Sequence, residues 1–99
     1  MDRERREYER RKYLAPVDFA SKARPYQRHI DDISQGGMRI ISREPIPQGT
    51  LLTLCFDIPG NHHVKIFGEV LRSGDDGLAV EFHPSLAKGR LKSLLRLLP

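Results

Sequence analysis

Residues 51–58 (LLTLCFDI) place an apolar side chain at every second position, and this alternation constrains the fold more than any other feature of the chain. Leu52, Leu54, Phe56 and Ile58 would share one face of a β-strand, because successive side chains of a strand point to opposite sides. Further strand-like segments, separated by turns rich in Gly, Pro and Asp, occur at 17–19, 25–30, 38–40, 64–72 and 78–82. The pattern predicts an all-β fold.

Six short strands in a chain of 99 residues favour a closed six-stranded antiparallel β-barrel, because closure removes the exposed edges of a small open sheet. After the last strand, leucines recur at helical spacing and predict an amphipathic C-terminal α-helix over about 85–98. Residues 1–13 carry almost no apolar side chains. We therefore expect a flexible N-terminal arm over 1–13 and one barrel domain with its helix over 14–99.

The charges are unevenly distributed along the chain, whose formal net charge is +4. Residues 1–13 hold six basic and four acidic side chains, and residues 85–99 hold four basic and no acidic ones. The segment between them is slightly acidic, whereas a general nucleic-acid binder more often carries a basic stripe on its folded body. The distribution favours an anionic ligand held by the arm, and we expect no specific nucleic acid as a partner.

Several functional classes find no support in the sequence. No apolar run approaches the roughly 20 residues of a membrane span, so we expect no membrane insertion. The charged N-terminus is unlike a secretory signal, and the single cysteine cannot form an internal disulfide, so we expect a cytoplasmic protein in which Cys55 is buried. We find no catalytic motif and expect no enzyme and no cofactor. The adjacent His62 and His63 lack the further ligands of a metal site, so we expect no metal.

Two arginines of the arm, Arg6 and Arg10, form an RxxxR motif. A guanidinium group is planar and permanently charged, so it can bind a phosphate bidentately or the O6/N7 edge of guanine. Arginines four residues apart can converge on one ligand. The alternative is an ordinary solvated charge cluster that nearby glutamates neutralise. The same spacing also occurs at Arg24/Arg28 and Arg39/Arg43.

The segment DISQGG (Asp32–Gly37) combines a carboxylate, a hydroxyl and two glycines. Asp32 can accept hydrogen bonds from the N1–H and N2–H groups of guanine, and Ser34 can both donate and accept. Gly36 and Gly37 would permit positive φ and a close approach of the backbone to a ligand. The alternative is a tight turn between strands, where Asp, Ser and Gly are common for local reasons.

The two motifs, in this order, resemble the signature of the PilZ domain, which is RxxxR followed by (D/N)xSxxG. The resemblance extends over essentially the whole chain, through Pro16-Val17, the run PIPQGTLLTL, Gly68–Val70 and the closing segment LAVEF. PilZ domains are bacterial receptors for the second messenger cyclic di-GMP. The resemblance implies a β-barrel that binds this nucleotide.

The resemblance also implies roles for individual residues. Arg6 and Arg10 would contact phosphates and guanine edges, and Asp32 and Ser34 would hold a guanine. Gly36 and Gly37 would shape the turn. An arginine directly before RxxxR, here Arg5, tends in this family to accompany two intercalated cyclic di-GMP molecules per chain.

The resemblance predicts a cyclic di-GMP receptor that changes the conformation of its arm on binding and signals to a downstream protein. We expect the arm to be mobile without ligand, because its arginines repel one another. Two alternatives remain. The chain could be a degenerate PilZ-type adaptor that binds a protein without nucleotide, or a small RNA- or DNA-binding barrel that uses the basic arm.

Overall fold

The structure is a computed structural model that describes residues 9–22, 24–83 and 88–98. Within these ranges the chain forms strands and one short helix. The elements are β1 (Arg11–Lys12), β2 (Pro16–Ser21), β3 (Arg24–Ile33), β4 (Gly37–Ile41), β5 (Leu51–Ile58), β6 (His62–Gly74), β7 (Gly77–Phe82) and α2 (Lys88–Leu95).

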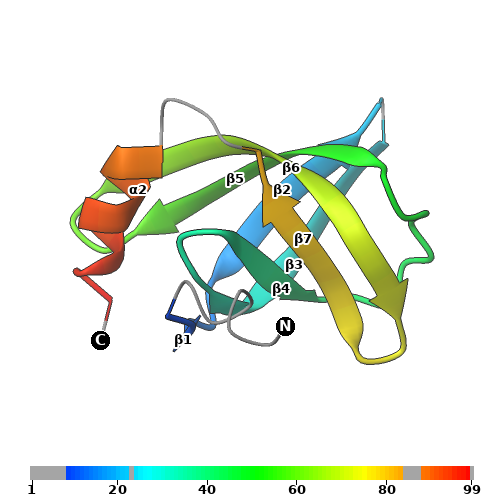
Figure 1. Cartoon of the computed structure of the whole chain (residues 1–99), viewed down its shortest axis with the longest axis horizontal. Coiled ribbons are helices and arrows are strands. Elements are labelled where there is room, and N and C mark those ends of the chain that lie inside the picture. The colour runs from blue at the N-terminus through cyan, green and yellow to red at the C-terminus, as the bar shows by residue number, and fades with distance from the viewer. Residues whose placement is uncertain (1–8, 23, 84–87, 99) are drawn as a thin grey trace, which may run out of the picture.

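Six of the strands close into a barrel in which every neighbouring pair is antiparallel (Figure 1). The order around the barrel is β3-β2-β5-β6-β7-β4, and β4 pairs with β3 to close it. Strand β1 is an addition to this barrel and pairs with the far end of β3. The prediction of a six-stranded antiparallel barrel is confirmed.

The interior of the barrel follows the alternation seen in the sequence. Leu52, Leu54, Phe56 and Ile58 of β5 are all buried in the same hydrophobic core. The intervening side chains of β5 face outward, and Cys55 is one of them. The expectation that Cys55 is buried was therefore wrong, because strand alternation outweighs the apolar character of the segment.

Helix α2 packs its leucines against the same core. Leu91, Leu94, Leu95 and the following Leu98 are buried. The helix lies beside the end of the barrel where β5 finishes and β6 begins (Figure 1). It is shorter than the predicted span of 85–98, of which residues 85–87 lie outside the described residues.

Regular structure begins before the predicted end of the arm at residue 13. Arg11 pairs with Ile33 and Lys12 pairs with Asp32 in an antiparallel register. The backbone N–H of Tyr13 also donates to the carbonyl of Asp31, at 3.2 Å. The end of the arm is thus an extra strand that runs beside the DISQGG segment.

No helix in the described part of the chain has the length and apolarity that crossing a membrane requires.

Candidate functional site

Strand β3 contains a β-bulge that leaves two consecutive aspartates at the outer surface of the barrel. The register of β3 with β4 shifts between Ile30 and Asp32, so Asp31 is the additional residue. Ile30 and Ile33 are both fully buried. Because the bulge absorbs one residue between them, Asp31 and Asp32 both remain partly exposed beside β1.

Arg10 and Asp32, one residue from each predicted motif, lie next to each other. Arg10 Nη1 is 3.4 Å from Asp32 Oδ1. The register explains this contact, because Lys12 lies opposite Asp32 and Arg10 is two residues before it on the same side of the chain. The Arg10 side chain is 48% exposed, whereas that of Asp32 is only 18% exposed.

The carboxylate of Asp32 keeps an unused acceptor. Its Oδ1 atom is buried, and no group in the described residues donates a hydrogen bond to it. The contact with Arg10 is therefore an ion pair without hydrogen-bond geometry. Buried polar atoms in folded proteins are nearly always hydrogen-bonded, so this oxygen is suited to receive a donor from a ligand.

Lys12 neutralises the other aspartate of the bulge. Its Nζ donates to Asp31 Oδ1 at 2.9 Å. This hydrogen bond and the charge of Asp31 raise the pKa of Lys12 above its ordinary value, so the ammonium group stays charged. Asp31 is thereby engaged by the chain itself, and Asp32 is the carboxylate that remains available.

Ser34 forms the first corner of the turn that joins β3 to β4. Its backbone N–H donates to Gly37 O at 2.8 Å, and its Oγ accepts from the N–H of Gly36 at 3.2 Å. The hydroxyl also donates weakly to Gly37 O, at 3.4 Å. The side chain is buried, so within the described residues Ser34 stabilises the turn, as the alternative interpretation of the sequence stated.

Gly37 is required for packing. A Cβ atom at this position would lie 2.2 Å from the carbonyl oxygen of Val80 in β7, which is far inside van der Waals contact. Neither Gly36 nor Gly37 has a positive φ. The positive φ that these glycines would permit is not adopted, and the constraint at Gly37 is the close approach of β7 to the turn. The N–H of Phe82 fixes the same approach by donating to Gly36 O at 2.8 Å.

The competing Arg24/Arg28 pair is engaged elsewhere. Arg28 forms an ion pair with Glu44, and its guanidinium carbon lies 5.6 Å from the ring centre of Tyr26. Arg24 lies over the same ring at 5.9 Å. Arg24 and Arg28 therefore contact Tyr26 and Glu44 and not the DISQGG segment.

Arg39 is a neighbour of the site that the sequence argument did not select. It lies directly opposite Asp32 across β3 and β4, and its Nη1 is 3.6 Å from Asp76 Oδ2. A usable signal existed in the sequence. If Ser34–Gly37 is read as a hairpin turn, Ile33 must pair with Met38, which places Arg39 on the outer face beside Asp32.

Arg5 and Arg6 lie outside the described residues. The structure therefore brings together Arg10, Asp32, Ser34, Gly36 and Gly37 and says nothing of the other two predicted residues. Among the described residues, no group of three or more His, Cys, Asp or Glu side chains could hold a metal ion.

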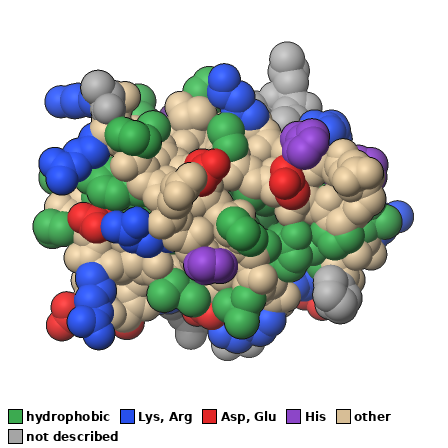
Figure 2. Space-filling view, turned by 180° about the vertical axis from the view of Figure 1, so that it is seen from behind, with side chains coloured by type: hydrophobic (Ala, Val, Ile, Leu, Met, Phe, Trp, Pro, Cys, Tyr) green, Lys and Arg blue, Asp and Glu red, His purple; other side chains and the backbone are tan. Residues whose placement is uncertain are grey.

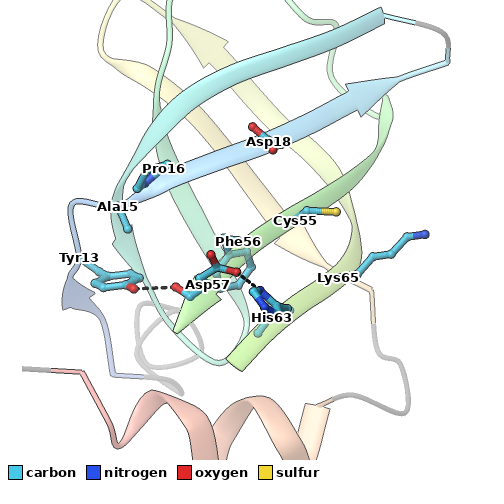
Figure 3. Close-up of a pocket in the computed structure, with 10 residues that line it drawn as sticks. Tyr13, Ala15, Pro16, Asp18, Cys55, Phe56, Asp57, His63 and Lys65 are labelled. Atoms are coloured by element: carbon cyan, nitrogen blue, oxygen red, sulfur yellow. Dashed lines mark hydrogen bonds and ion pairs between the residues drawn. The ribbon is translucent and has the colours of Figure 1, made fainter. Parts of the chain in front are cut away.

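A hollow of about 340 Å³ adjoins the end of the arm, and none of the predicted site residues lines it (Figure 3). The hydroxyl of Tyr13 donates to the carbonyl oxygen of Asp57 at 2.6 Å, and Asp57 Oδ1 lies 2.5 Å from His63 Nδ1. Burial, and to a lesser degree the charge of Asp57, raise the pKa of Tyr13 above its ordinary value. This chain of contacts fastens the end of the arm to the β5–β6 hairpin.

The charges on the rear face of the molecule do not form a basic stripe in its described part. Figure 2 shows Lys and Arg side chains mostly around the edge of this face, whereas hydrophobic, acidic and His side chains occupy more of its middle. Nucleic-acid binding over this face finds no support in that distribution.

The sequence model of the PilZ domain family matches residues 4–98. The chain belongs to the PilZ domain family. A comparison with curated proteins finds no matching sequence.

Solved structures share this PilZ fold. The PilZ domain of CeSA from a cellulose-synthesizing bacterium is similar with a TM-score of 0.73 and 14% identity, over 90% of this chain and 94% of that one. The inhibitor of motility MotI/DgrA of Bacillus subtilis is similar with a TM-score of 0.74 and 18% identity, over 91% of this chain and 47% of that one. The uncharacterized Legionella protein Lpg0364 has a TM-score of 0.63 and 21% identity, over 90% and 91% of the two chains.

Proposed function

We propose that this PilZ domain is a cytoplasmic receptor for cyclic di-GMP that passes the bound state on to a partner protein. The observation that carries the proposal is the contact of Arg10 with Asp32. It places one residue of each PilZ motif within 3.4 Å of the other, at a carboxylate that has an unused buried acceptor.

The chemistry of these two groups matches the two ends of a guanine nucleotide. Asp32 accepts from the N1–H and N2–H groups of a guanine, and Arg10 binds a phosphate or the O6/N7 edge. On binding, the nucleotide replaces the contact between Arg10 and Asp32. The guanine then donates to the carboxylate, and a phosphate or the O6/N7 edge accepts from the guanidinium. Ser34 and Gly37 fix the turn between β3 and β4 and so keep Asp32 in the position where a nucleotide can bind it.

Arg5 and Arg6 complete the binding site in this proposal. Their charges and that of Arg10 repel one another, and an anionic nucleotide removes that repulsion. Ordering of the chain before β1 costs roughly 1–2 kcal/mol per residue in backbone entropy, so only a ligand that touches both the arm and the DISQGG turn can sustain it. The ordered arm then becomes part of the surface that a partner protein recognises.

Calorimetric titration with cyclic di-GMP tests the proposal, with GTP and a single-stranded RNA as controls. We expect micromolar affinity or tighter, about −8 kcal/mol or better, and no comparable heat from either control. The expected endpoint is two nucleotides per chain, falling to one in Arg5→Leu. An endpoint of one for the parent protein would reject the intercalated pair. Absence of binding would leave the nucleotide-free adaptor as the function.

A further inference from the structure

Three large apolar side chains are exposed together on the outer face of β5 and β6. Leu51 is 62% exposed, Phe67 is 56% exposed and Leu71 is 47% exposed. Leu51 lies opposite Glu69, and Phe67 and Leu71 lie two residues before and after Glu69 in β6. Diagonal neighbours in a sheet are about 7–8 Å apart, so the three side chains form one patch around Glu69. We call it the Phe67 patch.

The surface beside Phe67 is hollowed. The hollow has a volume of about 590 Å³, enough for side chains of a partner. Its lining combines four apolar side chains with one Lys, one Thr and one His. The lining residues are Ala20, Lys22, Leu51, Leu52, Thr53, Phe67 and His83.

An acidic pair borders the Phe67 patch. Glu69 of β6 lies directly opposite Glu81 of β7. Like charges opposite each other destabilise a sheet, so this pair weakens the free protein. Among the side chains that the structure describes, no Lys or Arg forms an ion pair with either glutamate, and His83 Nε2 is 4.0 Å from Glu69 Oε1. A cation supplied from outside would remove the repulsion.

The acidic pair connects the Phe67 patch to the candidate nucleotide site. Glu81 lies opposite Gly37 across β7 and β4. The next residue, Phe82, donates its N–H to Gly36 O at 2.8 Å. One continuous outer surface thus runs from the DISQGG turn across β7 to the Phe67 patch on β6 and β5.

We propose that this surface is the docking site of a partner protein segment that presents a Lys or Arg beside an apolar side chain. The apolar side chain enters the hollow between Leu51 and Phe67, and the cation lies over Glu69 and Glu81. An anionic membrane does not fit, because the two carboxylates repel it. The docking surface itself does not depend on the proposed function. Only a change of partner affinity on nucleotide binding rests on it, and that change is transmitted through the turn at Gly37 to Glu81 in β7.

Selection from a phage-displayed library of random 12-residue peptides on the 99-residue chain tests the proposal. We expect enriched peptides to carry Lys or Arg within four residues of a large apolar side chain. The dominant peptide, synthesised and measured by fluorescence anisotropy, should bind Phe67→Ser at least tenfold more weakly than the parent. The matched control is Leu97→Ser, which removes a leucine of similar exposure beyond α2 and should change the affinity less than twofold. Circular dichroism of both variants checks that the barrel is retained.

A charge reversal tests the role of the glutamates separately. The double variant Glu69→Lys/Glu81→Lys should lose the parent's peptide and select acidic peptides instead. No enrichment, enriched peptides without a cation, or equal affinity for Phe67→Ser and Leu97→Ser would overturn the docking surface. Self-association of the parent that Phe67→Ser abolishes would also overturn it in favour of a second copy of the chain.

The same measurements separate this inference from the proposed function. Peptide binding with the expected pattern, in a protein that gives no heat with cyclic di-GMP, would reject the receptor function and still support the docking surface. If cyclic di-GMP binds and the peptide pattern is absent, the docking surface is rejected and the receptor function stands.

Discussion

Replacing Arg10 by Ala should weaken cyclic di-GMP binding while leaving the barrel intact. Arg10 precedes β1, and within the described residues its half-exposed side chain forms an ion pair with Asp32 at the outer surface. Solvent-exposed ion pairs contribute about 0.2–1 kcal/mol to stability, and this pair belongs at the upper end because its Arg10 side is half-exposed and its Asp32 Oδ1 is buried. We therefore expect the free energy of unfolding to change by less than about 1 kcal/mol.

The loss of affinity follows from two opposing contributions. A charge-assisted hydrogen bond from Arg10 to the nucleotide contributes about 1.5–3 kcal/mol. Binding also breaks the existing contact with Asp32, which costs the parent protein up to about 1 kcal/mol and costs the variant nothing. The net loss is about 0.5–3 kcal/mol, or roughly two- to 140-fold in Kd.

Calorimetry of Arg10→Ala, Arg10→Lys and Arg11→Ala measures this effect. Arg11 is the matched control. Its guanidinium lies 3.9 Å from Glu9, and because it pairs with Ile33, its side chain lies on the opposite side of β1 from the one that faces Asp32. We expect Arg10→Lys to fall between parent and Arg10→Ala, because an ammonium keeps the charge and loses the bidentate geometry. Parent-like affinity for Arg10→Ala, with a clear loss for Arg11→Ala, would refute the assignment of the motif.

Three further substitutions test the frame of the site. Gly37→Ala should destabilise the barrel by about 2–3 kcal/mol in urea unfolding and abolish nucleotide binding, because its Cβ would meet the Val80 carbonyl oxygen at 2.2 Å; a fully stable variant would contradict the packing argument. Ser34→Ala should remain folded but lose about 1–3 kcal/mol of stability, because the N–H of Gly36 loses its acceptor; unchanged thermal unfolding would show that the hydroxyl is dispensable for the turn. Tyr13→Phe should cost about 1 kcal/mol at pH 7. The folded-state pKa of Tyr13 is raised above the ordinary 10.0, so its contribution is complete below pH 10 and is lost as the pH rises further. The stability difference between Tyr13→Phe and parent should therefore shrink above pH 10, and a difference that grows there would reverse the sign of this argument.

The sequence predicts the barrel well because its interior obeys a simple rule. Alternation along β5 alone specifies which side chains are buried, and the structure places Leu52 through Ile58 accordingly. Cys55 is one of the intervening residues, and the same alternation places it outside despite the apolar character of its segment.

The candidate site was less predictable because it depends on contacts between distant segments. The bulge at Asp31 has no local signature, and it decides that two adjacent aspartates both reach the outer surface. Likewise, the requirement for Gly37 comes from β7, more than forty residues along the chain. The structure brings Arg10, Asp32, Ser34, Gly36 and Gly37 together, and the physical reason for each position comes only from the pairing of the strands.

Hydrogen exchange of the amides, with and without saturating cyclic di-GMP, tests the central claim most directly. The claim is that the nucleotide joins the arm to the DISQGG turn at Arg10 and Asp32. We predict a sharp rise in protection for residues 4–10, with little change at 11–13, which are already paired with β3, or in β5, which is already paired on both sides. Equal protection of residues 4–10 in both states, in a protein that demonstrably binds the nucleotide, would contradict the account.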